Sequence, residues 1–550
     1  MAARCTTRLQ AGWFLLLVSV LLPAVSVAAD KAGASDPAAG SRLYFEGLLP
    51  SGQPVQATVT GDVPVSGDQL ACVSCHRRSR LGTSEAGRQV SPVTADALFG
   101  PGANSKVKGV LPKAFARIAS NRPAYDDRSL ARAIRDGVNS AGTALAPSMP
   151  RYALSETEMA ALIAFLREQP AGPPPGVTET DLHFATVVTE DAPKDQRDLV
   201  VGMLEAYFKD KNSTTRHETK RAQFSAYKMY QVYRKWQLHV WQLRGPSSTW
   251  PAQLERYHKS QPVLALISGL STQSWRPVHR FCEERQVACL FPNTSLPTVA
   301  DGDFYSVYYT RGLTLEAQTI AKFLQDNPDP ARKVVQIYRD SETGTVAAEA
   351  FRAKAAGIAV EDLRLPAGQG LTPALLAKFG DPARPPTLLL WLKPEDLTGL
   401  PDLAKAYPQI PAIFLAAGLA GESLPESWAA LNNRLYLTYP WELPERRQSR
   451  SVKAKTWLQA KHIPLTHERL QIDTFFAVTL LGESVKAILD NFSSAYLLER
   501  IEDMVGTLTP STYYPRLSLG AGQRFASKGC YLVRPAAAGK LVVAGGWIVP

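Results

Sequence analysis

Two cysteines and a histidine stand together in the run Ala71-Cys72-Val73-Ser74-Cys75-His76. Two thiols separated by two residues can both add to the vinyl groups of one porphyrin, and a histidine beside the second thiol can coordinate the iron from the same turn of chain. The spacing is therefore typical of one covalently attached haem c. Half of a zinc site and a redox dithiol are the alternatives, but no second Cys/His pair stands nearby to complete a zinc site.

An iron held by His76 needs a sixth ligand or stays open to small molecules. The next histidine is His183, beyond a proline-rich break, so the segment between them offers only Met149 and Met159. Met159 begins a helical pattern of apolar residues, which favours a place in a packed core. Met149 stands between two prolines, which disfavour helix and hold the chain extended. We predict Met149 as the distal ligand, and Met/His ligation favours electron transfer over catalysis.

The N-terminus has the layout of a secretory signal peptide. Arg4 and Arg8 precede the apolar run 13–22, and small residues stand at a cleavage position, which predicts a signal peptide over residues 1–29. An Ala/Gly/Ser-rich segment, residues 30–40, is expected to be flexible. The apolar run is too short for a comfortable membrane span, and no later stretch qualifies. Because haem c is attached outside the cytoplasmic membrane, the predicted location is the periplasm, with a soluble mature chain.

The chain has 550 residues and a formal net charge of +11 at neutral pH. A basic surface suits docking to an acidic protein partner, and a merely solvated basic face is the alternative. Nucleic acid is not expected as a partner of an exported chain.

A proline-rich run at residues 170–176 divides the chain, and we expect a linker over residues 170–180. Before it, residues 41–169 include two predicted helices, 127–137 and 155–169, the second opening on a Ser155/Glu158 capping box. After it, residues 181–550 alternate short apolar strands with helices, which predicts parallel sheets covered by helices on both faces. This part is too long for one such sheet, so two lobes are expected. The predicted strands cover residues 182–189, 238–243, 263–267, 288–291, 333–338, 387–392 and 412–415, and the predicted helices among them cover 198–208, 315–324 and 347–356.

The first part resembles the class I monohaem cytochromes c. The resemblance is carried by Cys72-Val73-Ser74-Cys75-His76-Arg77-Arg78-Ser79, by Met149-Pro150-Arg151-Tyr152 and by a final amphipathic helix. It implies a small all-α domain over residues 41–169. A Gly- and Pro-rich insert between His76 and Met149 departs from the plainest members.

The second part resembles the type I periplasmic solute-binding proteins of the kind that bind branched-chain amino acids. The resemblance is carried, in order, by residues 265–269, 290–297, 338–344 and 522–529. It implies a two-lobed α/β domain over residues 181–550 with a ligand between the lobes, at the carboxyl ends of strands. The matching positions give a tentative ligand set, with turn and cap chemistry as the alternative for each residue: Ser271, Thr272, Asn293, Thr294, Ser295, Asp340 and Ser341. No carboxylate at these positions takes the place of the acid that binds the ligand's ammonium group in the family, which does not favour an amino acid.

Cys282 and Cys289 flank a short connection between a helix and a strand. A disulfide between them is plausible in an oxidising compartment, and two buried free thiols are the alternative.

The combination predicts a periplasmic electron carrier with a domain that recognises a solute or a partner. The second half also resembles binding proteins associated with PQQ-dependent alcohol dehydrogenase systems, so a quinoprotein dehydrogenase or a terminal oxidase chain is the expected redox partner. Two alternatives remain: a solute receptor of an ABC importer with a haem redox-sensor domain, and a haem enzyme of the peroxidase type. No catalytic motif for hydrolysis or nucleotide binding is present, so an electron carrier and binding protein is favoured over an enzyme.

Overall fold

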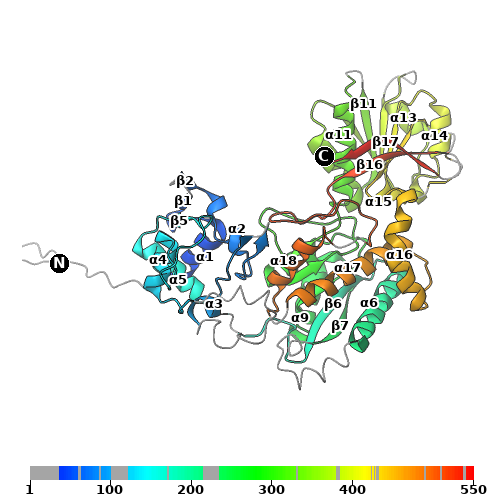
Figure 1. Ribbon diagram of the computed structural model, residues 1–550. Helices are drawn as coiled ribbons and strands as arrows, with labels where there is room; N and C mark the ends of the chain where they lie inside the picture. The colour runs from blue at the N-terminus through cyan, green and yellow to red at the C-terminus, as the bar shows by residue number, and fades with distance from the viewer. Residues whose placement is uncertain are drawn as a thin grey trace, which may run out of the picture.

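The computed structural model describes residues 36–59, 63–85, 88–100, 122–169, 172–214, 234–329, 332–379, 384–422, 433–488, 491–507, 511–536 and 540–550, with residues 424–425, 428 and 431 between the longer segments. The predicted signal peptide, residues 1–29, lies outside the described residues, as do residues 30–35 and the first two residues of the predicted linker. The chain forms an N-terminal domain and two larger α/β lobes (Figure 1).

The N-terminal domain packs its first and last helices against each other, α1 and α5. Both helices carry apolar residues into one core with Tyr152 and Leu130. Gly40 makes the close crossing possible, because a Cβ at this position would lie 2.1 Å from the carbonyl oxygen of Ala161. The elements of this domain are α1 (Pro37–Glu46), β1 (Gln56–Val59), β2 (Val63–Ser66), η1 (Asp68–Leu70), α2 (Val73–His76), β3 (Ser84–Glu85), β4 (Arg88–Gln89), α3 (Ala95–Phe99), α4 (Asp127–Asp136), β5 (Arg151–Tyr152) and α5 (Glu156–Arg167).

Two expectations for this domain are corrected. It is not all-α, because β2, β1 and β5 form an antiparallel sheet and β3 and β4 form a short hairpin. The predicted flexible segment 30–40 ends earlier than expected, because residues 37–40 already belong to α1. Asp36 caps this helix by accepting a hydrogen bond from the Ala38 amide, which starts the helix before Ser41.

Lobe 1 is built on a parallel sheet with the strand order β10-β9-β8-β6-β7. Helices cover both faces, as expected for alternating strands and helices. Figure 1 places α17 and α18, from late in the chain, on this lobe, with α17 packed against both α6 and α18. Its elements are β6 (Asp181–Thr189), α6 (Lys194–Thr214), β7 (Lys235–Leu243), η2 (Ser247–Thr249), α9 (Trp250–Ser260), β8 (Ala265–Ile267), α10 (Arg276–Arg285), β9 (Ala288–Leu290), β10 (Ser306–Val307), α17 (Glu468–Ile488) and α18 (Ser494–Met504).

Lobe 2 has a mixed sheet with the order β12-β11-β13-β14-β15-β16-β17. The first five strands are parallel, and β16 and β17 join as an antiparallel edge that the strand pattern did not predict. Its elements are α11 (Leu313–Asp326), β11 (Lys333–Arg339), α12 (Glu342–Lys354), β12 (Ala359–Leu365), α13 (Pro373–Leu376), η3 (Ala377–Phe379), β13 (Thr387–Trp391), η4 (Pro394–Asp396), α14 (Leu400–Ala406), β14 (Ile413–Ala416), α15 (Ala417–Ala420), β15 (Leu435–Tyr439), β16 (Cys530–Pro535) and β17 (Leu541–Ile548).

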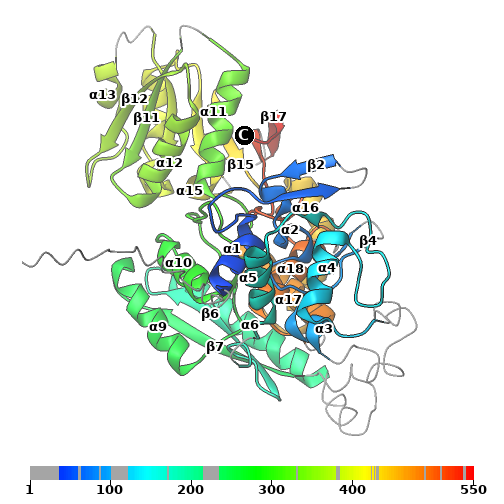
Figure 2. The same cartoon turned by 90° about the vertical axis from the view of Figure 1, so that its left-hand side faces the viewer.

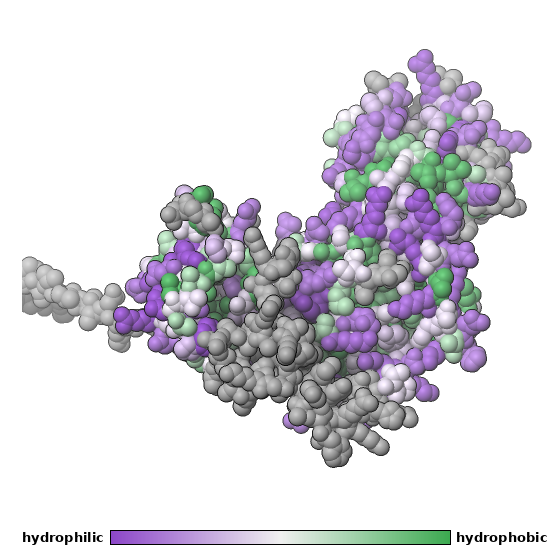
Figure 3. Space-filling model, viewed as in Figure 1, coloured by the Kyte–Doolittle hydropathy of each residue, from purple (hydrophilic) through white to green (hydrophobic). Residues whose placement is uncertain are grey.

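The chain passes between the lobes three times: between β10 and α11, from β15 through α16 (Pro444–Ala460) to α17, and from α18 to β16. Hydrophobic residues gather on the face of lobe 2 seen in Figure 3, and β17 contributes the exposed side chains of Val542 and Val543. Among the described residues, no helix combines the length and the apolar character of a membrane span.

Candidate functional site

Cys72, Cys75 and His76 share one helical turn. The amides of Cys75 and His76 both donate to the carbonyl of Cys72, at 3.3 and 2.8 Å, so the three side chains leave the same turn of chain. Burial raises the pKa of Cys72 to about 12. A thiol with this pKa is protonated at neutral pH as long as no cation or other group binds it.

The ring of His76 is held in one tautomer. Its Nδ1 lies 2.9 Å from the carbonyl oxygen of Ser91, and a carbonyl can only accept a hydrogen bond. Nδ1 therefore carries the proton, and Nε2 keeps the lone pair that a metal ligand needs. Burial also lowers the pKa of His76, which favours the neutral ring.

Met149 is tied to the segment that carries the cysteines. It is half-buried and packs against the same hydrophobic core as Cys72. Three residues later, the Tyr152 hydroxyl donates to the carbonyl oxygen of Leu70 at 2.8 Å, just ahead of the cysteine turn. Met149 itself closes a turn, with its amide bonded to Ala146 at 3.0 Å, so the expectation of an extended chain at this point is wrong.

The donor set fits a covalently attached haem. Two thiols and a neutral imidazole stand on one turn, and a thioether stands on a segment that is hydrogen-bonded to the residue just before this turn. Met159 lies inside α5 with 2% of its surface exposed, as its apolar pattern predicted. Of the two methionines, Met149 is therefore the one that lies outside a helix core and can act as a ligand.

The turn that follows His76 is docked on lobe 1. The backbone amide and the hydroxyl of Ser79 donate to the two carboxylate oxygens of Glu499 on α18, at 2.8 and 2.5 Å. Arg77 forms ion pairs with Glu502 at 3.3 Å and Asp503 at 3.2 Å. Only 11% of the Arg77 side chain and 3% of the Glu502 side chain are exposed, so this pairing is shielded from water.

Arg78, between these two residues, lies among aromatic rings. Its guanidinium is 5.0 Å from the ring centre of Phe45 in α1 and 4.8 Å from that of Phe304 in lobe 1. Cation–π contacts of this kind add to the charged contacts of the same turn. Figures 1 and 2 both place α2 of the N-terminal domain beside α18.

The predicted ligand residues of lobe 1 come together at the ends of β8 and β9. The amide of Ser271 donates to the carbonyl oxygen of Asn293 at 3.3 Å. The amide of Thr272 donates to Asp191 at 2.9 Å, and its hydroxyl bonds to the same carboxylate. The Asn293 amide group donates to the hydroxyl of Ser268 at 3.1 Å. The remaining members of this group are Thr294, whose hydroxyl accepts from the Leu296 amide, and Ser295, whose carbonyl accepts from Leu313.

The predicted residues of lobe 2, Asp340 and Ser341, follow β11. Ser341 caps α12 by accepting a hydrogen bond from the Gly344 amide at 3.3 Å, and Asp340 is exposed. The next residue, Glu342, accepts a hydrogen bond at 3.2 Å from the amide of Ser274 in lobe 1. The two predicted groups therefore stand at edges of the lobes that touch each other.

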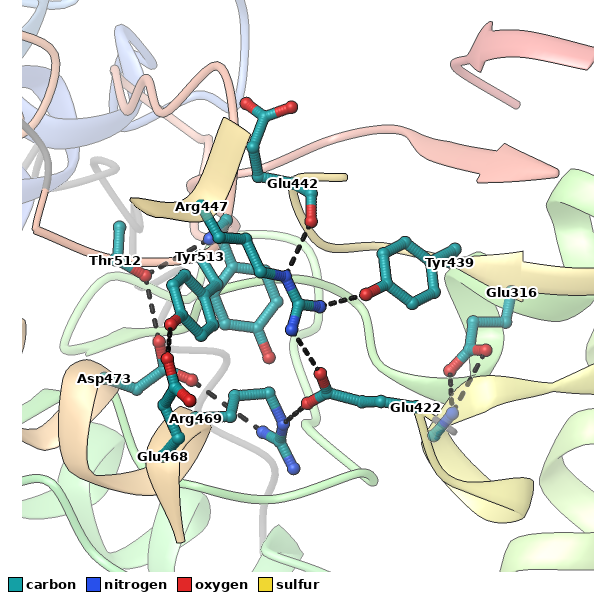
Figure 4. A network of polar contacts seen from close by, with 12 residues as sticks. Glu316, Glu422, Tyr439, Glu442, Arg447, Glu468, Arg469, Asp473, Thr512 and Tyr513 are labelled. Atoms are coloured by element: carbon teal, nitrogen blue, oxygen red, sulfur yellow. Dashed lines mark hydrogen bonds and ion pairs between the residues drawn. The ribbon is translucent and has the colours of Figure 1, made fainter. Parts of the chain in front are cut away.

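A second polar cluster between the lobes was not predicted from the sequence (Figure 4). Glu422, which follows α15 in lobe 2, binds two arginines: Arg447 of α16 at 2.6 Å and Arg469 of α17 at 2.8 Å. Arg447 also donates to the carbonyl oxygen of Glu442 at 2.8 Å and to the hydroxyl of Tyr439. Glu422 thus connects lobe 2 to the first turn of a lobe 1 helix.

Asp473 lies at the base of this cluster and has no exposed surface. One carboxylate oxygen accepts from the Thr512 hydroxyl at 3.0 Å. The other lies 3.8 Å from Arg469 and has no hydrogen bond to any residue that the structure describes. Burial raises the pKa of Asp473 to about 7, although the charge of Arg469 opposes the shift. The Tyr309 hydroxyl donates to the Asp473 carbonyl, and its ring stacks on Tyr514 at 4.8 Å.

No local pattern in the sequence predicts this cluster. Arg447 and Arg469 stand in charged stretches that are typical of solvated helix faces, and only the fold brings them to Glu422. Trp441 also lies here, with the Arg469 guanidinium 4.9 Å from its ring centre. Two other tryptophans, Trp275 and Trp391, belong to the cores of lobes 1 and 2.

The predicted disulfide is not formed in the structure, where Cys282 and Cys289 are buried free thiols. Cys282 lies in the last turn of α10 and Cys289 in the middle of β9. Burial raises the pKa of Cys282, and the neighbouring Cys289 adds to the effect. The alternative expected from the sequence, two buried thiols, describes the structure.

The chain matches no protein-family model and no curated protein sequence. Solved structures do match. One is a branched-chain amino acid ABC transporter protein from Thermus thermophilus with bound valine, at a TM-score of 0.52 and 11% identity, covering 68% of this chain and 98% of the other. A leucine-binding protein from Thermotoga maritima matches at a TM-score of 0.46 and 14% identity, covering 67% and 99%. A fatty acid ABC transporter substrate-binding protein from Thermomonospora curvata matches at 0.46 and 14%, covering 69% and 95%.

The match to the Thermus thermophilus protein spans about two thirds of the present chain and nearly all of the other. The two lobes also make up about two thirds of the chain, so the matched part corresponds in size to the two lobes. The match and the topology agree on architecture: the described residues of the two lobes have a two-lobed α/β fold like that of the Thermus thermophilus protein.

Proposed function

We propose that the chain is an exported solute-binding protein that carries one covalently attached haem c on its N-terminal domain. The observation that supports the first half of this proposal is the two-lobed fold shared with a protein that holds valine. Loops at the carboxyl ends of β8, β9 and β11 meet where the lobes touch, and such loops are the usual ligand sites of open α/β sheets. The solute would be a small polar molecule, and an ABC importer would be the partner.

The haem half of the proposal rests on this chain's own residues. Cys72 and Cys75 would hold the group covalently, His76 would offer Nε2 to the iron and Met149 its thioether. When bound, the haem supplies a one-electron redox centre. Because Arg77 and Ser79 fasten this turn to α18, the redox centre would stand against the lobe that binds the solute, as a redox sensor of the receptor.

The second candidate is the electron carrier predicted from the sequence, with a quinoprotein dehydrogenase or a terminal oxidase chain as the redox partner. The hydrogen bond from Tyr152 to Leu70 holds the segment of Met149 next to the cysteine turn, which favours the electron carrier. A methionine ligand closes the iron to small molecules and suits electron transfer. The two candidates share the same haem site and differ in what the lobes recognise.

Ligand binding separates them. We would follow thermal unfolding of the purified holoprotein against valine, leucine, short fatty acids and small alcohols. A ligand at about 100 times its Kd adds about 2.7 kcal/mol to the free energy of unfolding, which is readily seen as a higher Tm. Asn293→Ala should weaken binding about tenfold, which lowers the added free energy to about 1.4 kcal/mol at the same ligand concentration. Ser260→Ala, at the exposed end of α9, should leave it unchanged. If no compound raises the Tm and a quinoprotein dehydrogenase reduces the haem rapidly, the electron carrier is favoured.

A further inference from the structure

Lobe 1 carries three side chains of metal-ligating types close together. They lie outside the proposed solute site between the lobes and outside the haem turn, residues 72–76. His279 and Glu283 stand one turn apart on α10, so both side chains leave the same face of the helix. Asp303 comes from the loop before β10. One donor atom from each residue lies within 4.8 Å of the other two.

The histidine has a hydrogen-bond partner at each ring nitrogen. Its Nε2 lies 2.8 Å from a carboxylate oxygen of Asp303, and its Nδ1 lies 3.0 Å from the hydroxyl of Tyr308. Because a carboxylate only accepts, Nε2–H donates to Asp303 in this structure and the Tyr308 hydroxyl donates to Nδ1. A cation at Nε2 would select the other tautomer, in which Nδ1–H donates to the Tyr308 oxygen. Histidines that bind metals are oriented in this way by a partner on the other ring nitrogen. The His279 side chain is 6% exposed, so the orientation is fixed by packing as well.

Glu283 has an oxygen that lacks a partner. Its Oε2 accepts hydrogen bonds from the amides of Phe304 and Tyr305, at 2.8 and 3.0 Å. Its Oε1 is buried and has no hydrogen bond among the described residues. A buried carboxylate oxygen without a partner is costly, and a bound cation would remove that cost.

We propose that His279, Glu283 and Asp303 bind one divalent transition-metal ion, Zn²⁺ before the others. One imidazole nitrogen and two carboxylate oxygens form a donor set that Zn²⁺ accepts, and three protein ligands leave a position for water. The absence of a thiolate makes Cu⁺ a poor occupant. The site is independent of the proposed solute site, because none of its residues belongs to the cleft.

A metal at this position would act on the haem turn. It would fasten Asp303 to α10, and the next two residues, Phe304 and Tyr305, form the surface that Arg78 contacts. Arg78 stands two residues after His76 in the chain. Metal binding would therefore strengthen the docking of the N-terminal domain on lobe 1.

The test is a calorimetric titration of tag-free, chelator-treated full-length protein with ZnCl₂. One ion should bind per chain. Glu283→Gln and Asp303→Asn should each weaken binding at least tenfold. The matched control is Glu284→Gln, at the next position of α10, where the exposed side chain pairs with Arg280 and should not affect binding.

Tyr308→Phe keeps the shape of the site and removes only the hydroxyl that orients His279, so it tests the site even if a ligand variant fails to fold. Loss of such a partner typically costs about 10-fold or more in metal affinity. Limited proteolysis should also show slower cleavage between the N-terminal domain and lobe 1 when Zn²⁺ is present. Failure of the parent protein to bind Zn²⁺, or equal binding by Tyr308→Phe, Glu283→Gln and the Glu284→Gln control, would overturn the proposal.

Discussion

Ser79 and Glu499, 420 residues apart in the chain, meet at the boundary between the N-terminal domain and lobe 1. The carboxylate of Glu499 accepts both the amide and the hydroxyl hydrogen of Ser79 and is 1% exposed. Ser79 stands three residues after His76, so the segment that carries Cys72, Cys75 and His76 is also the segment that fastens the two parts together.

Removal of this contact should release the N-terminal domain. In Glu499→Ala, the Ser79 amide and hydroxyl lose a charged acceptor, which should weaken docking by about 3 kcal/mol, or roughly 100-fold. We expect a larger radius of gyration in X-ray scattering and faster proteolysis near residues 170–180. Glu445→Ala, exposed in the first turn of α16, is the control and should behave like the parent. An unchanged scattering curve for Glu499→Ala would show that other contacts hold the domain.

The free energy of unfolding should depend on Asp473 and Glu316 near neutral pH. Burial raises the pKa of each carboxyl to about 7 in the folded chain, whereas the unfolded chain releases these protons near pH 4. Between about pH 4 and pH 7 the folded state therefore holds more protons than the unfolded state. The contribution of both groups to the free energy of unfolding falls as pH rises through this range and levels off above it.

Asp473→Asn should flatten this dependence by an amount of the order of 2 kcal/mol between pH 5 and pH 8. Glu316→Gln should remove a separate part of it. Denaturant unfolding at several pH values gives the slopes, with the exposed Asp340→Asn as the control. Parallel curves for Asp473→Asn and the parent would mean that Asp473 is already ionised at pH 5.

Gly40→Ala should destabilise the N-terminal domain. The new Cβ would lie 2.1 Å from the carbonyl oxygen of Ala161 and 2.9 Å from the Cβ of Phe165, so α1 and α5 must move apart. We expect a loss of about 2–3 kcal/mol, measured by thermal unfolding of this domain. In Gly202→Ala the Cβ meets no atom within 4 Å, and this helix glycine should give no loss or a gain of up to about 1 kcal/mol. Similar effects of both substitutions would contradict the close crossing.

Met149→Ala should keep a covalently attached haem and open its iron to carbon monoxide. The thioether is removed, while Cys72, Cys75 and His76 are untouched. Optical spectra of the reduced protein with and without carbon monoxide measure the change. Met159→Leu is the control, because Met159 packs inside α5 and should not affect ligand access. If Met149→Ala and the parent take up the gas equally, another group is the distal ligand.

Local signals in the sequence predicted local structure well. The capping box of Ser155 and Glu158 opens α5, and the strands expected from apolar runs correspond to β6, β7, β8, β9, β11, β13 and β14 within a few residues. These features depend on residues that are close together in the chain, so the local sequence is enough to predict them. The cysteine turn is local for the same reason, and its three side chains leave one turn as the spacing required.

Features that depend on distant parts of the chain were missed. β16 and β17 return to lobe 2 after two helices of lobe 1, and their pattern does not show which sheet they join. The contacts of Ser79 with Glu499 and of Glu422 with two arginines join charged residues that are typical of exposed surfaces when taken singly. The all-α expectation failed because β1 and β2 are short strands of one hairpin, and the sheet is completed by β5 from much later in the chain.

We expect one chain to hold both a haem and a solute. Mass spectrometry measures both, on protein purified from the periplasm of a host that attaches haem c and then exposed to a metabolite extract. Under denaturing conditions we expect the mass of the cleaved chain plus one haem, and under native conditions the further mass of one small organic molecule. A denatured mass equal to the bare chain, or a native mass without any bound molecule, would show that the chain does not hold both.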